Sequence, residues 1–251
     1  MVQFDLTGRS ALVTGAGRGI GRATAVGLAQ AGADLAVAAR TRSELDSLAR
    51  EIELIGRQAL VCVADITQRH QVDRMVQAAV QRFGRIDILV NNVGISIPQP
   101  AEEVTEEAWD TLVDTNLKGT FFVSQAVGRT MIARRKGVII NVVSELAFVA
   151  LPDYACYSAT KAGIVALTRS LALEWARYGL RVNAVAPAAI ETAANDVLGT
   201  EEARQQSLAR LPVGRCGSVD DLVGAMIYLA SDASSYVLGT TLMVDGGRVI
   251  I

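Results

Sequence analysis

The sequence predicts an α/β protein built on a doubly wound parallel sheet with helices on both faces. Short, mostly apolar runs alternate along the chain with segments of helical periodicity. Apolar runs of this kind are typical of parallel strands buried on both faces, and strand–helix alternation is typical of βαβ units. No linker, internal repeat or low-complexity run interrupts the 251 residues, so we expect a single domain over residues 1–251.

The elements follow from these patterns in chain order. We expect strands at 11–13, 34–39, 59–63, 86–90, 137–143, 181–186 and 241–244. After Gln68, apolar residues recur at the i, i+3, i+4 spacing of a one-sided helix: Val72, Met75, Val76, Ala79, Val80 and Phe83. The longest irregular stretch runs from Pro187 to about Val219, and long loops of this kind often cover a site. We therefore predict a substrate lid around residues 188–218.

Composition excludes several classes of partner. The 24 basic and 26 acidic residues give a formal net charge of −2, which provides no field for nucleic acid or an anionic membrane. No apolar run approaches the ~20 residues that span a bilayer, and the N-terminus resembles no secretory signal, so we expect a cytoplasmic protein. His70 is expected to be a solvated residue at a helix start. The three cysteines are odd in number and far apart, which favours neither disulfides nor a metal site.

A glycine-rich run follows the first predicted strand and opens the first predicted helix. It reads Thr14-Gly15-Ala16-Gly17-Arg18-Gly19-Ile20-Gly21. Glycines let the backbone turn sharply and approach a pyrophosphate, and a helix N-terminus presents free N–H groups to that anion. The run alone would also fit a tight turn. Its strand-to-helix context predicts a Rossmann-like dinucleotide site with contacts from Gly15, Arg18, Gly19, Ile20 and Gly21.

The end of the second predicted strand indicates which dinucleotide binds. NAD-selective sites place an acidic residue there for the ribose hydroxyls, but this chain reads Ala38-Ala39-Arg40-Thr41-Arg42. Arg40 is placed to grip a 2′-phosphate, with Arg18 closing from the other side, and forked guanidinium donors suit that group. The alternative is that both arginines are ordinary surface charges. The pattern favours NADPH/NADP over NAD.

Tyr157 and Lys161 lie four residues apart, so a helix would place both on one face. A phenol titrates near pH 10, and an adjacent ammonium stabilises the phenolate. We expect Lys161 to lower the pKa of Tyr157 towards neutrality, where a phenol can exchange a proton with a substrate oxygen. Such a pair also arises by chance in many helices, so its meaning depends on the other motifs.

Together these motifs resemble the short-chain dehydrogenase/reductase family in its single-domain form, over essentially the whole chain. The family's glycine signature is matched by Gly15, Gly19 and Gly21, and its Asn-Asn-Ala-Gly element by Asn91-Asn92-Val93-Gly94. The resemblance places its catalytic tetrad on Asn116, Ser144, Tyr157 and Lys161. It implies further cofactor contacts from Asp65, Ile66, Asn91, Gly94, Tyr157, Lys161, Pro187, Ile190 and Thr192. Val244-Asp245-Gly246-Gly247 resembles the family's last strand and turn.

The resemblance implies reduction of a ketone or aldehyde to an alcohol, or the reverse oxidation. Tyr157 would donate a proton to the carbonyl oxygen and Ser144 would hydrogen-bond the same oxygen. Lys161 would also hold the nicotinamide ribose, and Asn116 would anchor a water on a proton path. As isolated residues, Ser144 would also fit a turn cap and Asn116 a helix kink.

Two departures from the family pattern concern the pocket rather than the reacting groups. Val93 stands where the family usually has Ala, so extra bulk is expected near the cofactor. Ala188 stands where the family usually has Gly, and it would be strained if that position required a positive φ.

Substrate contacts are expected from Ser144, Glu145, Leu151 and Tyr157. Glu145 would accept a hydrogen bond from a hydroxyl or amine and repel anions, or it would simply be a solvated or capping carboxylate. An apolar wall, or alternatively core, is expected from Phe148, Leu151, Tyr154, Ile190 and Leu198.

Three alternative functions remain open. A 3-oxoacyl-thioester reductase of fatty acid synthesis needs a basic surface for its carrier; Arg129 fits one, but Leu173 stands where such reductases often carry Arg. A sugar or sugar-acid dehydrogenase would use lid arginines at 204, 210 and 215, although Glu145 argues against an acid. A non-catalytic NADPH sensor would have no need for Ser144, Tyr157 and Lys161 together.

The resemblance also implies an assembly. The family usually forms homotetramers or homodimers through the two long helices that here contain Asn116 and Tyr157. Aromatic residues in those regions would serve that interface or the core: Trp109, Phe121, Phe122 and Trp175.

Overall fold

A computed structural model of the chain describes residues 4–191, 205 and 208–251. Its centre is a seven-stranded sheet in which every pairing is parallel, in the order β3-β2-β1-β4-β5-β6-β9. The strands are β1 (Ser10–Thr14), β2 (Asp34–Ala39), β3 (Ala59–Val63), β4 (Ile88–Asn91), β5 (Gly137–Val142), β6 (Leu180–Pro187) and β9 (Thr241–Val244). A separate short pair joins β7 (Ile190–Glu191) to β8 (Gly217–Ser218).

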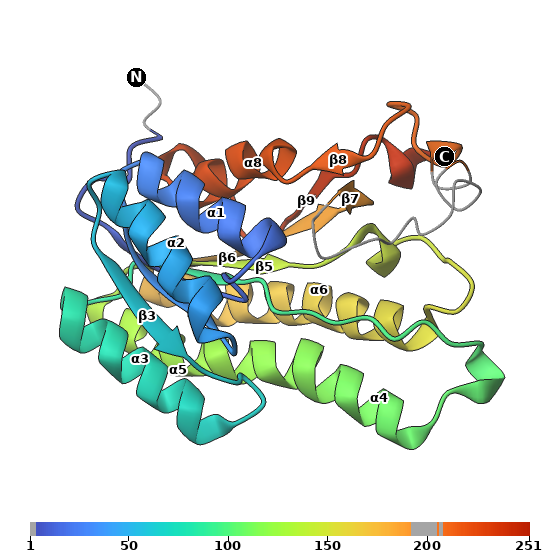
Figure 1. Cartoon of the computed structure of the whole chain (residues 1–251), viewed down its shortest axis with the longest axis horizontal. Helices are drawn as coiled ribbons and strands as arrows, with labels where there is room; N and C mark the ends of the chain where they lie inside the picture. Colours follow the sequence, from blue (N-terminus) through green and yellow to red (C-terminus); the bar gives the residue numbers. More distant parts are fainter. Residues whose placement is uncertain (1–3, 192–204, 206–207) are drawn as a thin grey trace.

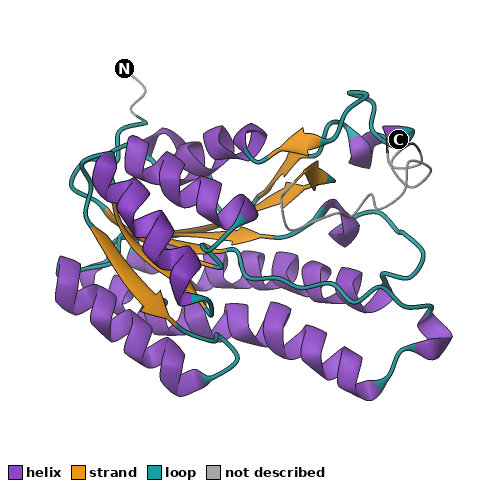
Figure 2. Cartoon of the chain, in the orientation of Figure 1, coloured by secondary structure: helices purple, strands orange, loops and turns teal. Residues whose placement is uncertain are grey.

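Helices cover both faces of this sheet (Figures 1 and 2). One face carries α1 (Gly19–Gln30), α2 (Arg42–Leu54) and α8 (Asp220–Ala230), and the other carries α3 (Arg69–Phe83), α5 (Gly119–Arg134) and α6 (Ala155–Trp175). The short α4 (Glu106–Leu112) leads through a π-helical turn, Val113–Lys118, into α5. The fold is therefore the Rossmann-like, doubly wound α/β architecture that the sequence predicts.

The core divides into two layers because neighbouring strand residues point to opposite faces. Val13 packs with Leu28 and Met226 in one cluster, while Leu12 packs with Val76 and Val127 in the other. All seven predicted strands are confirmed, with ends shifted by at most about two residues. The predicted helix after Gln68 is α3, and it ends at Gly84, whose φ of 75° suits glycine. His70 is exposed in its first turn, as expected.

A chain of buried polar side chains joins the central strands to the second helix layer. Asn91 Nδ2 donates to Ser124 Oγ at 2.8 Å and to Asn141 Oδ1 at 2.9 Å. Asn141 Nδ2 then donates to Thr168 Oγ1 at 2.9 Å. Buried polar groups are stable only when they are paired. The network therefore fixes β4, β5, α5 and α6 relative to one another directly beneath the carboxyl ends of the strands.

The strand order reverses between β1 and β4, where the chain crosses from one half of the sheet to the other. In open α/β sheets, ligands bind beyond the carboxyl ends of the strands at this switch point. No helix within the described part of the chain is long and apolar enough to cross a bilayer.

Replacing Thr168 with valine tests the buried network. Thr168→Val keeps the side-chain volume but leaves Asn141 Nδ2 without its acceptor, so we expect the free energy of unfolding to fall by about 1–3 kcal/mol. Urea unfolding followed by circular dichroism measures this change. Ser170→Ala, an exposed change on the same helix, is the matched control. Equal midpoints for the two variants would show that the network does not contribute to stability.

Candidate active site

The glycine-rich loop after β1 has the geometry of a dinucleotide cradle. Gly15 and Gly19 adopt φ values of 64° and 55°, which side chains other than glycine rarely tolerate. A Cβ at Gly21 would lie 2.2 Å from the carbonyl oxygen of Gly15, so the first turn of α1 packs against the loop without room for a side chain. These three predicted glycines are therefore required by the backbone itself.

Two residues that directly follow β4, Asn92 and Val93, support this loop. Asn92 Nδ2 donates to the carbonyl oxygen of Gly15 at 3.0 Å, and the Asn92 backbone N–H donates to Thr14 Oγ1 at 3.2 Å. Val93, the first departure from the family pattern, lies against the same loop, because a Cβ on Gly15 would be 3.2 Å from its Cγ2. The Asn91-Asn92-Val93-Gly94 element already indicated in the sequence that these two residues lie near the cofactor loop.

The side chains expected around the adenosine end of the cofactor differ in their exposure and in their hydrogen-bond partners. Arg18 and Arg40 are exposed, and neither has an ion-pair partner among the described residues. Asp65 Oδ1 accepts from the Thr67 backbone N–H at 2.9 Å and from Thr67 Oγ1 at 2.8 Å. Ile66 is buried, and its Cδ1 would lie 2.8 Å from a Cβ on Gly119, so its side chain is part of the core.

The remaining predicted cofactor residues lie along the carboxyl edge of the sheet. Ile20 is half-buried against the first core layer, and Pro187 ends β6 opposite Val244. Asn91 is buried with its amide nitrogen committed to the polar network, whereas its Oδ1 is buried without a hydrogen-bond partner among the described residues. Thr192 lies outside the described residues, as do Leu198, Arg204 and nearly half of the predicted lid. Ala188 is not among the described residues with positive φ, so the expected strain is absent there.

The predicted tetrad converges from three elements. Ser144 follows β5, Tyr157 and Lys161 lie one turn apart on α6, and Asn116 sits in the π-helical turn before α5. Lys161 is buried; its Nζ donates to the carbonyl oxygen of Val142 at 3.0 Å and lies 5.6 Å from the centroid of the Tyr157 ring. The sequence prediction that these side chains share one site is consistent with this geometry.

Asn116 connects the loop after β4 to the catalytic helix. Its Oδ1 accepts from the Ile95 backbone N–H, and its Nδ2 donates to the Ile95 carbonyl oxygen, both at 2.9 Å. Nδ2 also donates to Thr160 Oγ1 at 3.1 Å. Gly94 lies between these groups, and a Cβ there would be 3.0 Å from Lys161 Nζ. Single π-helical turns often occur at functional sites, and this one aims the Asn116 side chain into the site.

The pKa expected for Tyr157 is corrected by the structure. Burial, the negative charge of Glu145 and the neighbouring Tyr154 raise the pKa of Tyr157 to about 12, against the smaller opposing effect of the Ser144 hydroxyl. Burial also lowers the pKa of Lys161 from 10.5 to about 8. The sequence shows the spacing of the pair but not its burial, and burial is the largest cause of both pKa shifts. Tyr157 is therefore protonated at neutral pH.

Beside the tetrad lies a pocket of about 210 Å³ that mixes charged and apolar groups. Ser144 Oγ accepts from the Leu146 backbone N–H at 3.2 Å and donates to Glu145 Oε2 at 3.0 Å. Burial raises the pKa of Glu145, while that hydrogen bond and the charge of Arg248 oppose the rise. The pocket brings together the predicted substrate residues Ser144, Glu145, Leu151 and Tyr157 with Tyr154 and Ile190.

The same pocket contains two arginines that reach it from distant parts of the chain. Arg210 comes from the stretch after residue 208, and Arg248 comes from the turn after β9. The sequence analysis considered Arg210 as a lid charge but missed Arg248, because no spacing links it to Ser144. Two other expectations fail: Phe148 is 38% exposed and does not line the pocket, and Arg215 is paired with Asp221 at 2.6 Å.

A glycine-rich loop after β1 beside a cluster of Ser144, Tyr157 and Lys161 is the arrangement expected of one class of protein, the dinucleotide-dependent oxidoreductases. The family model described as Enoyl-(Acyl carrier protein) reductase matches residues 15–248. The chain is 43% identical to gluconate 5-dehydrogenase of Gluconobacter oxydans over 98% of this chain and 97% of the relative. It is 42% identical to the 3-oxoacyl-[acyl-carrier-protein] reductase FabG of Thermotoga maritima over 98% and 99%.

Solved structures show the same similarity. A gluconate 5-dehydrogenase from Burkholderia cenocepacia, crystallised with NADP and tartrate, superimposes with a TM-score of 0.95 at 43% identity, covering 100% of this chain and 98% of that one. The chain belongs to the short-chain dehydrogenase/reductase family. The resemblance inferred from the motifs is thereby confirmed, and the protein is an enzyme rather than a nucleotide sensor.

Replacing Lys161 with methionine separates stability from activity. At pH 7 the burial of its charge costs about 3 kcal/mol, partly offset by about 1 kcal/mol from the hydrogen bond to Val142. We therefore expect Lys161→Met to abolish turnover but to raise the free energy of unfolding by about 1–2 kcal/mol. Urea unfolding at several pH values measures the difference.

The difference in the free energy of unfolding between Lys161→Met and the wild type should depend on pH. Because the folded-state pKa is lowered, the unfolded chain binds more protons than the folded chain between about pH 8 and pH 10.5. The penalty is thus complete below about pH 8 and is lost as the pH approaches 10.5. The advantage of Lys161→Met should shrink over this range. A variant less stable than the wild type at pH 7 would contradict the assignment of a costly buried ammonium.

Proposed function

We propose that this protein interconverts a secondary alcohol and a ketone on a polyhydroxy acid, with NADP(H) as cofactor. The reaction class, carbonyl reduction or the reverse oxidation, follows from the family. The observation that carries the substrate proposal is the pair of arginines, Arg210 and Arg248, in the pocket next to Ser144 and Tyr157. Guanidinium groups bind carboxylates through paired, charge-assisted hydrogen bonds.

The residues around the glycine loop fit NADP(H). The positive φ values of Gly15 and Gly19 let the loop turn tightly after β1, and the start of α1 presents its free N–H groups there. Arg18 and Arg40, exposed and without carboxylate partners among the described residues, are available to a 2′-phosphate. When bound, the cofactor supplies or accepts the hydride. Lys161, next to Gly94, is placed for the nicotinamide ribose.

The remaining chemistry belongs to this chain's side chains. Tyr157, protonated at neutral pH, donates its proton to the substrate oxygen in reduction. Ser144 donates a hydrogen bond to the same oxygen and stabilises its developing charge. Lys161 holds a positive charge beside the phenol, and this charge stabilises the phenolate that forms when Tyr157 gives up its proton. Asn116 fixes the loop after β4 against α6 and lies on the proposed proton path.

The charges of the pocket suit a substrate with an acid at one end and hydroxyls along its length. Glu145 and Glu191 offset Arg210 and Arg248, so Glu145 does not make the pocket repel anions, contrary to the objection raised from sequence. The positive charge of Arg248 lowers the pKa of Glu145 and so opposes the effect of burial. A positive and a negative group therefore lie in one cavity. Glu145 is placed to accept a hydrogen bond from a substrate hydroxyl near the reacting carbon, and an arginine to bind the carboxylate.

The relatives support this assignment over the thioester alternative. Two of the similar proteins are named gluconate 5-dehydrogenases, and one of them was crystallised with the hydroxy acid tartrate. The 42% identity to a FabG reductase keeps 3-oxoacyl thioesters as the second candidate. On this chain, however, Leu173 is 81% exposed where a carrier-binding arginine was expected, and Arg129 donates to Gln125 on its own helix.

We also propose that the chain is one domain with a substrate lid around residues 188–218, working as a homotetramer in the cytoplasm. Strands from Ser10 to Val244 share one sheet, and the three cysteines are buried and form no disulfide, which suits a reducing compartment. Exposed Leu173 on α6 supports an interface between copies, whereas Trp175 packs within the chain against Gly128. A monomeric mass in light scattering would overturn the assembly.

The substrate proposal is tested by NADPH oxidation across matched ketones. We expect turnover with a 5-oxo-aldonate and little with a neutral keto sugar or a 3-oxoacyl thioester. Arg248→Gln should raise KM for the oxo acid by about 10- to 100-fold, as expected for losing a charge-assisted hydrogen bond, with a smaller effect on kcat. The neutral substrate should not respond.

Arg129→Gln serves as the control and also tests the alternative. It changes an exposed arginine far from the pocket, so the oxo-acid kinetics should not change. Preferred turnover of thioesters on the carrier protein, weakened by Arg129→Gln but not by Arg248→Gln, would replace the proposal with the thioester reductase. Equal use of NADH and NADPH would show that Arg18 and Arg40 do not select the 2′-phosphate.

A further inference from the structure

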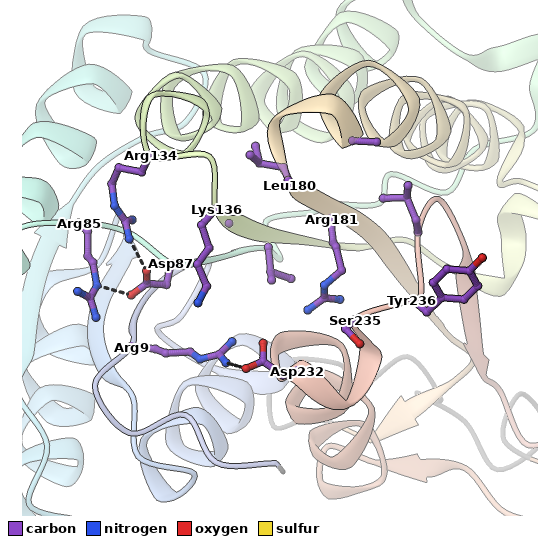
Figure 3. Close-up of a pocket in the computed structure, with 15 residues that line it drawn as sticks. Arg9, Arg85, Asp87, Arg134, Lys136, Leu180, Arg181, Asp232, Ser235 and Tyr236 are labelled. Carbon is purple, nitrogen blue, oxygen red and sulfur yellow. Dashed lines mark hydrogen bonds and ion pairs between the residues drawn. The ribbon is translucent and has the colours of Figure 1, made fainter. Parts of the chain in front are cut away.

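A second hollow lies at the opposite end of the sheet from the catalytic pocket, and it is larger, at about 710 Å³ (Figure 3). Its polar lining comes from the amino ends of neighbouring strands: Arg9 precedes β1, Asp87 precedes β4, Lys136 precedes β5 and Arg181 is the second residue of β6. Six residues of β5 separate Lys136 from the catalytic edge, about 20 Å at the rise of a strand. The two sites are therefore separate.

This hollow is strongly basic. Five cationic side chains line it against only two carboxylates, which leaves a formal charge of +3 in a chain whose total is −2. Asp87 is shared by Arg85, at 2.9 Å, and Arg134, at 3.0 Å. Asp232 is bound by Arg9 at 2.5 Å. Both carboxylates are thus already paired, and the excess charge is concentrated in this one place.

Lys136 and Arg181 carry two of these three excess charges, and the third arises because Arg85 and Arg134 share Asp87. Neither Lys136 nor Arg181 has a carboxylate in ion-pair contact among the described residues. Arg181 is half-buried, and its guanidinium donates only to neutral groups, Ser234 Oγ at 2.8 Å and the Ser231 carbonyl oxygen at 2.9 Å. In Figure 3 the side-chain tips of Arg9, Lys136 and Arg181 point towards a common space. A partly desolvated cation is stabilised when an anion completes its surroundings.

The rest of the lining is apolar and sits beside the charges. Leu180 and Leu238 form part of the wall, and the side chain of Tyr236 is fully exposed at its edge. Converging cations next to an apolar wall suit a molecule with clustered negative groups on an organic frame. A volume of this size also matches small-molecule sites rather than a flat docking surface.

We propose that this hollow, formed by Arg9, Lys136 and Arg181 at the amino ends of the strands, binds a small organic polyanion that carries clustered phosphate or carboxylate groups. Nothing in the catalytic proposal uses these residues, so the site is an additional one. Arg9 and Arg181 present forked donors to the anion, and exposed Lys136 contributes a mobile charge at the opening.

Calorimetric titration of the full chain, saturated with NADP⁺ to fill the cofactor site, tests this directly. ATP represents phosphate chemistry and citrate represents carboxylate chemistry. We expect saturable binding of at least one, weakened by high salt because the interaction is electrostatic. Lys136→Gln should weaken binding by about fivefold, and the charge reversal Lys136→Glu by more. Binding of ATP alone identifies a phosphorylated ligand, and binding of citrate alone a polycarboxylate.

The Lys136 side chain is exposed and makes no hydrogen bond to the described residues, so these variants should fold and keep wild-type turnover, which is checked in parallel. Arg50→Gln, an exposed arginine on α2, is the control and should leave binding unchanged. The conservative Arg181→Lys should retain part of the affinity. Absence of binding by both probes, or affinities that are the same for the wild type and Lys136→Glu, would overturn the proposal.

Discussion

The buried ammonium of Lys161 is the constraint on which the catalytic site depends. Its hydrogen bond to the carbonyl oxygen of Val142 holds α6 against the carboxyl end of β5, and this contact brings Tyr157 beside Ser144. The same charge explains why position 94 is glycine, since a side chain there would meet Nζ. Burying a cation costs stability, so the surrounding structure must hold the site together. The hydrogen bonds of Asn116 to Ile95 and Thr160 and the polar network beneath the strands do this.

The parallel sheet gives the two ends of the molecule different chemistry. All of its strands run in the same direction, so residues that follow strands gather at one edge and residues that precede strands gather at the other. The first edge carries glycines, the tetrad and a pocket whose charges balance. The second edge carries an excess of arginine and lysine with no catalytic group among its lining residues. Separate sites for reaction and for anion binding follow from this topology.

Sequence patterns were sufficient for the parts of this account that depend on order along the chain. The apolar runs predicted the strands, and the spacing of Gly15 to Gly21 and of Tyr157 to Lys161 predicted the loop and the helical face. Patterns failed where the result depends on burial or on distant residues. The pKa of Tyr157 rises because burial outweighs the hydrogen bond with Ser144, and Arg248 enters the pocket from a turn more than a hundred residues after Ser144.

The most direct test of the account is the turnover of Tyr157→Phe, measured together with NADPH binding by fluorescence titration. The variant removes one hydroxyl from a buried ring and leaves the glycine loop and Lys161 in place. The account predicts that kcat falls by at least about 100-fold, as expected for loss of a general acid, with NADPH affinity close to that of the wild type. Wild-type turnover in this variant would contradict the assignment of Tyr157 as the proton donor and the mechanism built on it.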